Sequence, residues 1–191
     1  MDVETKSEGE NKTLNSLVAV TVVVLSVFMA VCNIKDGNIV QNMQMQKADE
    51  VDSWGEYQGT KLKLGLAEST LVQLRVKAAE AAPGPVAEAV AKEMAVQQAI
   101  VDKQSKQAAE QLEKAKSFRP NIEALGYVDD QFDISEAFVS IAIAVSAVAA
   151  LTEIGWLLGL AWLSGSYGIA MGLAAFLGWK FHPEWLVSLL T

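Results

Sequence analysis

Residues 14–32 read LNSLVAVTVVVLSVFMAVC, a stretch without a single charge. At about 1.5 Å per residue, a helix of this length spans roughly 28 Å, close to the thickness of a bilayer core. The stretch is longer than the h-region of a signal peptide, its leader is acidic rather than basic, and no small-x-small cleavage site follows it. It is therefore predicted to be an uncleaved transmembrane helix, preceded by a disordered polar tail over residues 1–13.

A second apolar region extends from Ile134 to Trp179, and its only charges are Glu136 near the start and Glu153 near the centre. Two transmembrane helices and a tight turn need roughly 45 residues, which is about the length of this region. The sequence predicts transmembrane helices over residues 134–152 and 155–178, with Glu153 at the solvated tip between them. Residues 179–191 are too short to cross again and are predicted to form an interfacial tail.

Between the apolar regions, residues 38–117 are rich in Gln, Ala, Lys, Glu and Leu, all of which favour helix. Pro83-Gly84-Pro85 is the one strong helix breaker in this stretch. We expect two long helices folded into an antiparallel hairpin that turns at residues 83–85, followed by a linker or short surface helix over residues 118–133. The predicted fold is all-α, with three transmembrane helices and a long extramembrane helical hairpin.

The hairpin is predicted to close along a narrow seam with coiled-coil character. On its first helix Leu64, Leu71 and Leu74 share a face. The seam residues expected on its second helix are Val86, Val90, Met94, Val101 and Leu112, with Gln97 and Gln104 also at seam positions. Because such a polar seam buries little apolar surface, self-association is expected to supply the missing burial, which predicts a homo-oligomer.

Composition argues against several functions. The formal net charge is −8, and no stripe of Lys and Arg is present that would bind nucleic-acid phosphates or an anionic membrane surface. Cys32 is the single cysteine and His182 the single histidine, so neither a zinc site nor a Ser-His-Asp arrangement has support in the sequence. We expect no enzymatic activity, no cofactor and no metal.

Small residues recur in the last predicted span in two groups at four-residue spacing. These residues are Gly155 and Gly159, then Ser164, Gly168 and Gly172. Within lipid, this spacing lets helix backbones approach closely. Two interpretations remain open, namely packing inside one protomer's own transmembrane hairpin and a face for self-association. In both, the role of these residues is structural.

Trp54 and Tyr57 lie three residues apart and therefore share one face of a helix. They are interpreted as part of the hairpin core or, alternatively, as an aromatic patch that binds a partner protein. A position in the interfacial aromatic belt is disfavoured, because a continuous helix would place Trp54 about 30 Å beyond Cys32.

Three segments of the chain resemble one known family. They are KDGNIVQ at residues 35–41, Asp52-Ser53-Trp54 followed by Tyr57-Gln58, and Phe132-Asp133 leading into Glu136-Ala137. Together they resemble the bacterial domain-of-unknown-function family 4337. The resemblance implies one N-terminal span, a charged helical middle and a C-terminal two-span hairpin, and it implies no activity. This chain differs from the family pattern in its Ala/Gln-rich middle and in the acidic residue at its hairpin tip.

The charges near the predicted spans indicate an orientation. Five basic residues border the side that carries the helical middle and two border the other side: Lys35, Lys47, Lys116, Arg119 and Lys180 against Lys6 and Lys12. The positive-inside rule then predicts a cytoplasmic helical middle. We expect a bacterial inner-membrane protein that contacts the lipid bilayer, further copies of itself and a protein partner, and that serves as a scaffold or interaction module. The alternative is a subunit of an oligomeric channel or transport assembly.

Overall fold

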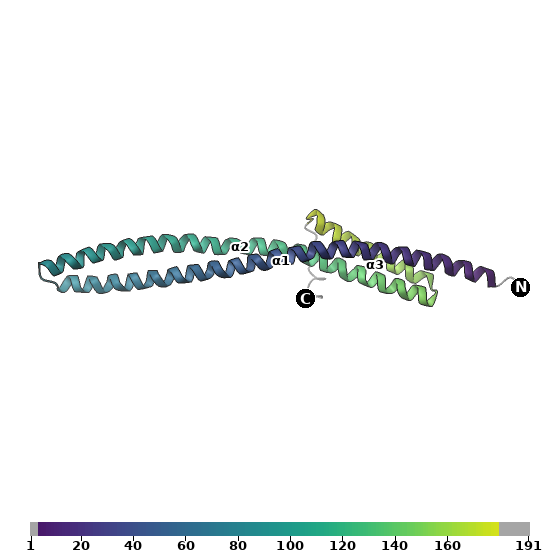
Figure 1. Cartoon of the computed structure of the whole chain (residues 1–191), viewed down its shortest axis with the longest axis horizontal. Helices are drawn as coiled ribbons and strands as arrows, with labels where there is room; N and C mark the ends of the chain where they lie inside the picture. The colour runs from purple at the N-terminus through teal and green to yellow at the C-terminus, as the bar shows by residue number, and fades with distance from the viewer. Residues whose placement is uncertain (1–3, 180–191) are drawn as a thin grey trace. The chain divides into compact units, whose positions relative to one another are not determined.

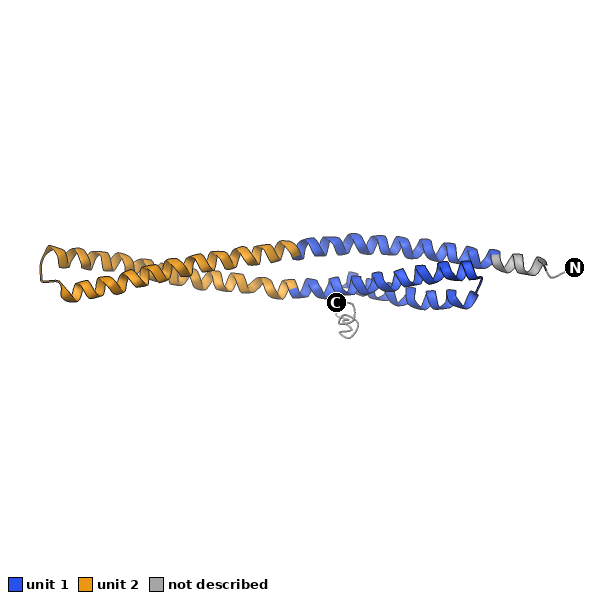
Figure 2. Cartoon of the chain, turned by 90° about the horizontal axis from the view of Figure 1, so that it is seen from below, with its two compact units in different colours: residues 1–43, 123–191 blue, residues 44–122 orange. Residues whose placement is uncertain are grey.

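The computed structural model describes residues 4–179, with side chains described from Lys12 onward. The helices are α1 (Glu4–Glu80), α2 (Pro85–Thr152) and α3 (Gly155–Leu177), and no strand occurs among the described residues (Figure 1). This confirms the all-α prediction. The chain forms two compact units: unit 1 comprises residues 1–43 and 123–191, and unit 2 comprises residues 44–122 (Figure 2).

All three helices are long and apolar enough to cross a membrane, as judged by length and composition. The spans predicted at residues 14–32, 134–152 and 155–178 fall within α1, α2 and α3 respectively, although α3 ends at Leu177. Only α3 is about as long as one membrane crossing. The other two helices continue far beyond their apolar segments, because the flanking sequence is also composed of good helix formers.

Two segments outside the predicted long helices belong to α1 and α2. Helix α1 begins at Glu4, so residues 4–13 are not a disordered tail. Glu and Lys make up half of this stretch, and extending an existing helix avoids the cost of nucleating a new one. Residues 118–133, predicted as a linker or a short surface helix, are helical, but as part of the long helix α2, with Pro120 inside it. Most of the predicted tail at residues 179–191 lies outside the described residues.

In unit 2, a segment of α1 and a segment of α2 lie side by side in both views (Figures 1 and 2). Their buried and half-buried residues recur at alternating spacings of three and four, the 3.5-residue period of a left-handed coiled coil. We call these residues the inner seam; they are Ser53, Tyr57, Thr60, Leu64, Ala67, Leu71 and Leu74 on α1, and Ala87, Val90, Met94, Gln97, Val101, Gln104, Ala108, Gln111 and Ala115 on α2.

The inner seam corrects one predicted residue. Val86 is exposed and its neighbour Ala87 lies in the seam instead. The prediction placed Val86, Val90 and Met94 at four-residue intervals, whereas the 3.5-residue period requires a step of three before Val90. The other predicted seam residues are buried or half-buried, including Leu112 beside the seam.

In unit 1, three helical segments pack through small layers of buried side chains. One layer joins Val18 of α1, Ala149 of α2 and Leu158 and Ala161 of α3. Others join Leu25 with Val139 and Ala142, and Cys32 and Ile39 with Phe132 and Ala175. Side-chain hydrogen bonds also cross between helices. The indole N–H of Trp162 donates to Thr21 Oγ1 at 3.0 Å, the Ser164 hydroxyl donates to the Phe138 carbonyl at 2.8 Å, and the Ser140 hydroxyl donates to Met29 Sδ at 3.6 Å.

The ends of α3 are defined by two left-handed residues. Glu153, between α2 and α3, is exposed and has φ 57°. Gly178 caps the C-terminus with φ 66°, and the N–H of Trp179 donates to the Ala174 carbonyl at 2.9 Å. The Trp179 carbonyl in turn accepts a 2.8 Å hydrogen bond from Gln131 Nε2, which ties the end of α3 to α2. The helix break predicted at residues 83–85 coincides with the gap between Glu80 and Pro85.

Candidate functional site

The small residues of α3 divide into a packed group and an open group. A Cβ atom built on Gly168 would lie 2.8 Å from Val139 Cγ2 and 2.9 Å from the Ser135 carbonyl oxygen. One built on Gly172 would lie 2.7 Å from Ser135 Oγ and 2.8 Å from Phe28 Cζ. Both glycines therefore permit a close approach of α3 to the other helices of the same protomer.

Ser164 belongs to the packed group through its hydrogen bond to Phe138. Gly165 also belongs to it, because a Cβ atom there would lie 3.2 Å from Leu25 Cδ2. Sequence reasoning missed Gly165, which does not follow the four-residue spacing.

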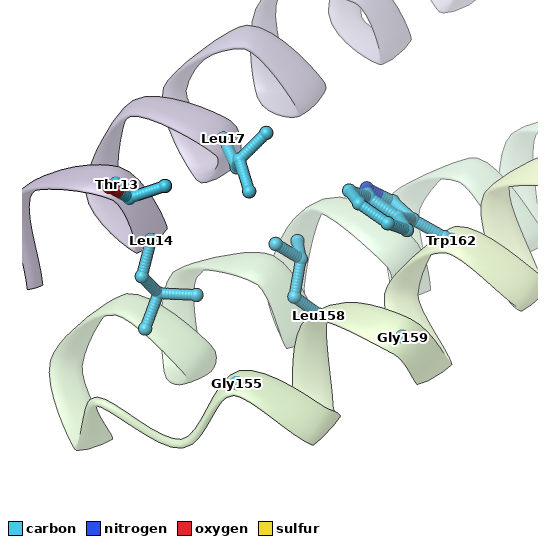
Figure 3. A pocket seen from close by; sticks show the side chains of 7 residues that line it. All are labelled: Thr13, Leu14, Leu17, Gly155, Leu158, Gly159 and Trp162. Carbon is cyan, nitrogen blue, oxygen red and sulfur yellow. The ribbon is translucent and has the colours of Figure 1, made fainter. Parts of the chain in front are cut away.

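Gly155 and Gly159 form the open group, since nothing lies within 4 Å of a Cβ atom built on either residue. Both line a hollow of about 590 Å³ between the start of α3 and α1. Figure 3 shows Leu17, Leu158 and Trp162 around this hollow, with the two glycines on the α3 ribbon below. The lining of the hollow carries no charged side chain and is mostly apolar, with Thr13 and Trp162 as its polar members.

A cluster of carboxylates lies where α1 and α2 leave their apolar segments. Burial, the charge of Asp129 and a side-chain hydrogen bond with Asp129 raise the pKa of Asp36 to about 7. Asp133 and Glu136 add further negative charge around it. Burial also raises the pKa of Asp133, with further contributions from Asp129, Asp130 and Glu136. Asp36 therefore keeps its proton closer to neutral pH than an ordinary Asp does.

This carboxylate cluster does not assemble a metal site. Among the residues whose side chains are described, no group of three or more His, Cys, Asp or Glu residues is arranged to hold an ion. The single histidine, His182, lies outside the described residues. Cys32 is a free, buried thiol in the core of unit 1.

Trp54 and Tyr57 are in contact, with ring centroids 5.8 Å apart and planes at 81°. Tyr57 is part of the inner seam, and Trp54 is half-buried at its edge. Edge-to-face contacts of this kind stabilise a core by about 0.5–1.5 kcal/mol beyond the area they bury. The two rings therefore pack against each other. Both interpretations of the pair, core packing and a partner-binding patch, stay predictions.

A second face of α1 in unit 2 lies opposite the inner seam and carries four exposed large apolar side chains, at Val51, Leu62, Val72 and Val76. Residues 48, 51, 55, 58, 62, 65, 69, 72 and 76 are all exposed and recur at alternating spacings of three and four. We call this set the outer stripe; it comprises Ala48, Val51, Gly55, Gln58, Leu62, Gly65, Ser69, Val72 and Val76. The sequence analysis did not predict this stripe. Its heptad period is nevertheless present in the sequence, because Val51, Leu62 and Val72 each lie two residues before an inner-seam residue.

These features define an all-helical protein with three helices able to span a membrane and, in unit 2, a polar pair of helical segments with one exposed apolar face. A family model described as a domain of unknown function (DUF4337) matches residues 14–178, and the chain belongs to that family. The match confirms the resemblance found in the sequence. No curated protein and no solved structure matches the chain.

Proposed function

We propose that this protein is a membrane-anchored interaction module of the bacterial inner membrane. Unit 1 anchors the chain in the bilayer, and unit 2 is a helical hairpin that binds proteins, further copies of this chain included. The observation that carries the proposal is the outer stripe, since an exposed apolar face along a helix is typical of protein interaction sites. No enzymatic step is part of the proposal.

The composition of the inner seam also supports an interaction role for unit 2, because it predicts a low stability of the helix pair. Its buried positions include Ser53, Thr60 and several alanines, each of which buries little apolar area. The Glu56–Lys114 ion pair joins the two segments at 3.8 Å, but both side chains are more than half exposed, so it adds little. A hairpin held this weakly gains stability when a partner covers its exposed apolar face.

The packing of α3 favours this function over a channel subunit. A pore lined by α3 would need its small-residue face to turn toward other protomers. Gly168 and Gly172 instead lie against Ser135, Val139 and Phe28 of the same chain. Of the five small residues predicted for close helix packing, only Gly155 and Gly159 are open for contacts beyond the protomer.

Photo-crosslinking in intact membranes tests the proposal. A photoreactive amino acid replaces Leu66, which borders the outer stripe, or Trp54, and the matched control replaces Lys103 on the charged outer face of α2. We expect protein adducts at Leu66 or Trp54 and few at Lys103. If neither position yields a protein adduct in the full-length chain, unit 2 is not an interaction surface and the proposal is wrong.

A further inference from the structure

The outer stripe lies on the face of α1 that points away from α2. Each of its residues from Val51 to Val72 precedes an inner-seam residue by two positions, as Val51 precedes Ser53 and Leu62 precedes Leu64. Two residues correspond to a rotation of about 200° around a helix, so the two sets lie on opposite sides of α1. The α1 segment of unit 2 therefore carries two heptad faces, of which α2 covers one.

Apolar exposure in unit 2 is concentrated on α1. Six of its eight exposed large apolar side chains belong to α1 and two to α2: Met45, Val51, Leu62, Leu66, Val72 and Val76 against Val86 and Val96. The corresponding positions of α2, two before an inner-seam residue, carry charge instead, at Glu88, Lys92, Asp102, Lys106 and Glu113. Only one of the two outer faces is therefore suited to bind another helix.

The centre of the outer stripe is shaped to receive side chains. A shallow hollow of about 740 Å³ follows residues 57–69 of α1 and includes Leu62, Gly65 and Leu66. Leu62 is 76 % exposed, and nothing lies within 4 Å of a Cβ atom built on Gly65. Leu62 can therefore serve as a knob that inserts into a second helix, and the space at Gly65 can form part of a hole that receives a side chain from it.

The residues flanking the outer stripe indicate which helix binds there. In a parallel two-stranded coiled coil with core positions a and d, the g residue directly before an a position faces the e residue of the partner chain, whose residue number is higher by five. Here Lys47 would face Asp52 of a second copy, and by symmetry each copy would supply both halves of this pair. The other flanking pairs, such as Lys61 with Leu66 and Glu68 with Gln73, bring no like charges together.

From this self-complementarity we infer that the outer stripe binds the same stripe of a second copy, as a parallel, in-register helix pair. The inference rests on the proposed function and names one partner for it. Anchoring in a shared membrane makes the two copies parallel without further cost. The two-fold axis then places each stripe residue opposite itself, with Leu62 beside Leu62 and Val72 beside Val72.

Disulfide formation between identical positions tests this geometry in the full-length chain. Cys32 is first replaced by Ala, and Leu62→Cys is then compared with Lys103→Cys on the outer face of α2. Under mild oxidation in membranes, we expect the variant at 62 to form a covalent dimer about tenfold faster, because a parallel pair gives its thiols a high effective concentration. Equal rates at the two positions would overturn the inference.

Charge reversal provides a second test, because random encounters of protomers in the bilayer would not make the cross-linking rate depend on the charges of residues 47 and 52. Lys47→Glu should slow cross-linking of the 62 variant, because two Glu–Asp repulsions replace two attractions. Adding Asp52→Lys should restore it. If the double variant stays as slow as the single one, Lys47 and Asp52 do not face each other. A missing 62 dimer combined with protein adducts at Leu66 would overturn this inference and leave the proposed function standing, whereas loss of both results would overturn both.

Discussion

At the scale of single residues, the glycines of α3 differ in what surrounds them. Gly168→Ala would place a methyl group 2.9 Å from the Ser135 carbonyl and 3.0 Å from the Val139 nitrogen, and these backbone atoms cannot move independently of α2. We expect this variant to be destabilised by about 1–3 kcal/mol, the usual cost of overpacking. The loss would be visible as a lower melting temperature in nanodiscs.

Gly159→Ala is the matched control on the same helix. Nothing lies within 4 Å of the added methyl group, and Ala favours helix by up to about 1 kcal/mol over Gly. Its melting temperature should equal or exceed that of the unmodified chain. Equal destabilisation of the two variants would show that Gly168 does not make the close contact described above.

Asp36 gives the fold a pH dependence. The ordinary pKa of an Asp is 3.8, and burial beside Asp129, Asp133 and Glu136 raises that of Asp36 to about 7. Between these two values the folded chain binds more protons than the unfolded chain, so stability falls as pH rises through the interval. Above about pH 7 the ionised carboxylate lies among other negative charges and opposes folding.

Asp36→Asn removes that ionisation while preserving the shape of the side chain. The variant should melt at a higher temperature than the unmodified chain at about pH 8, and the difference should shrink toward about pH 4, where Asp36 is protonated in the folded state. Asp49→Asn, on an exposed part of α1, is the control and should show no such trend. A pH-independent difference at Asp36 would contradict the raised pKa.

At the scale of elements, the inner seam contains buried polar atoms that oppose the pairing of α1 with α2 in unit 2. The side-chain oxygens of Gln104 and Gln111 are buried without a hydrogen-bond partner. A buried acceptor without a partner costs about 1–3 kcal/mol, and an apolar residue of similar volume removes that cost. These glutamines therefore lower the stability of the helix pair and leave more to be gained from association.

Gln104→Leu should accordingly stabilise unit 2. We expect slower amide hydrogen exchange in the neighbouring turns of α2 and in the facing turns of α1. Gln98→Leu serves as the control, because Gln98 is outside the seam and its Nε2 donates to Asp102 at 2.9 Å. If both substitutions slow exchange to the same extent, the effect comes from helix propensity rather than from the seam.

Some of these elements could be predicted from the sequence, and others could not. Pro83-Gly84-Pro85 predicts a helix break from local chemistry alone, and Leu64 and Leu71 predict the inner seam because large apolar residues are easy to recognise. Ser53 and Ala115 carry no apolar signal, so only the 3.5-residue period could have revealed their burial. The sequence also did not show that α2 continues through Pro120, where helix-forming residues on both sides outweigh one missing N–H group.

The candidate site depends even more on tertiary contacts. Spacing alone could not separate Gly168 from Gly159, since only the position of α2 decides which glycine is in close contact. The raised pKa of Asp36 depends on Asp129, which is distant in the chain. The outer stripe was readable from its heptad spacing, but its glycines and glutamine obscured the signal of Val51 and Leu62.

At the scale of the whole molecule, the remaining question is which side of the membrane carries unit 2. Lys35, Lys47, Lys116 and Arg119 lie beyond the apolar segments on the side of unit 2, whereas the turn between α2 and α3 carries only the acidic Glu153. By the positive-inside rule, unit 2 should be cytoplasmic and the turn periplasmic. Labelling single cysteines with a membrane-impermeant maleimide distinguishes the two orientations.

In the Cys32→Ala background, we expect Glu153→Cys to react in intact cells, because residue 153 is exposed at the tip of the turn. Lys103→Cys should react only after the inner membrane is opened, since it would face the cytoplasm. The two variants control each other, because a chain inserted in one orientation exposes only one of the two cysteines to the reagent in intact cells. The reverse pattern would place the outer stripe in the periplasm, where its binding partners would be periplasmic proteins rather than cytoplasmic ones. Labelling of both positions in intact cells would mean that the chain inserts in two orientations, and a parallel pair of outer stripes would then form only between copies inserted the same way.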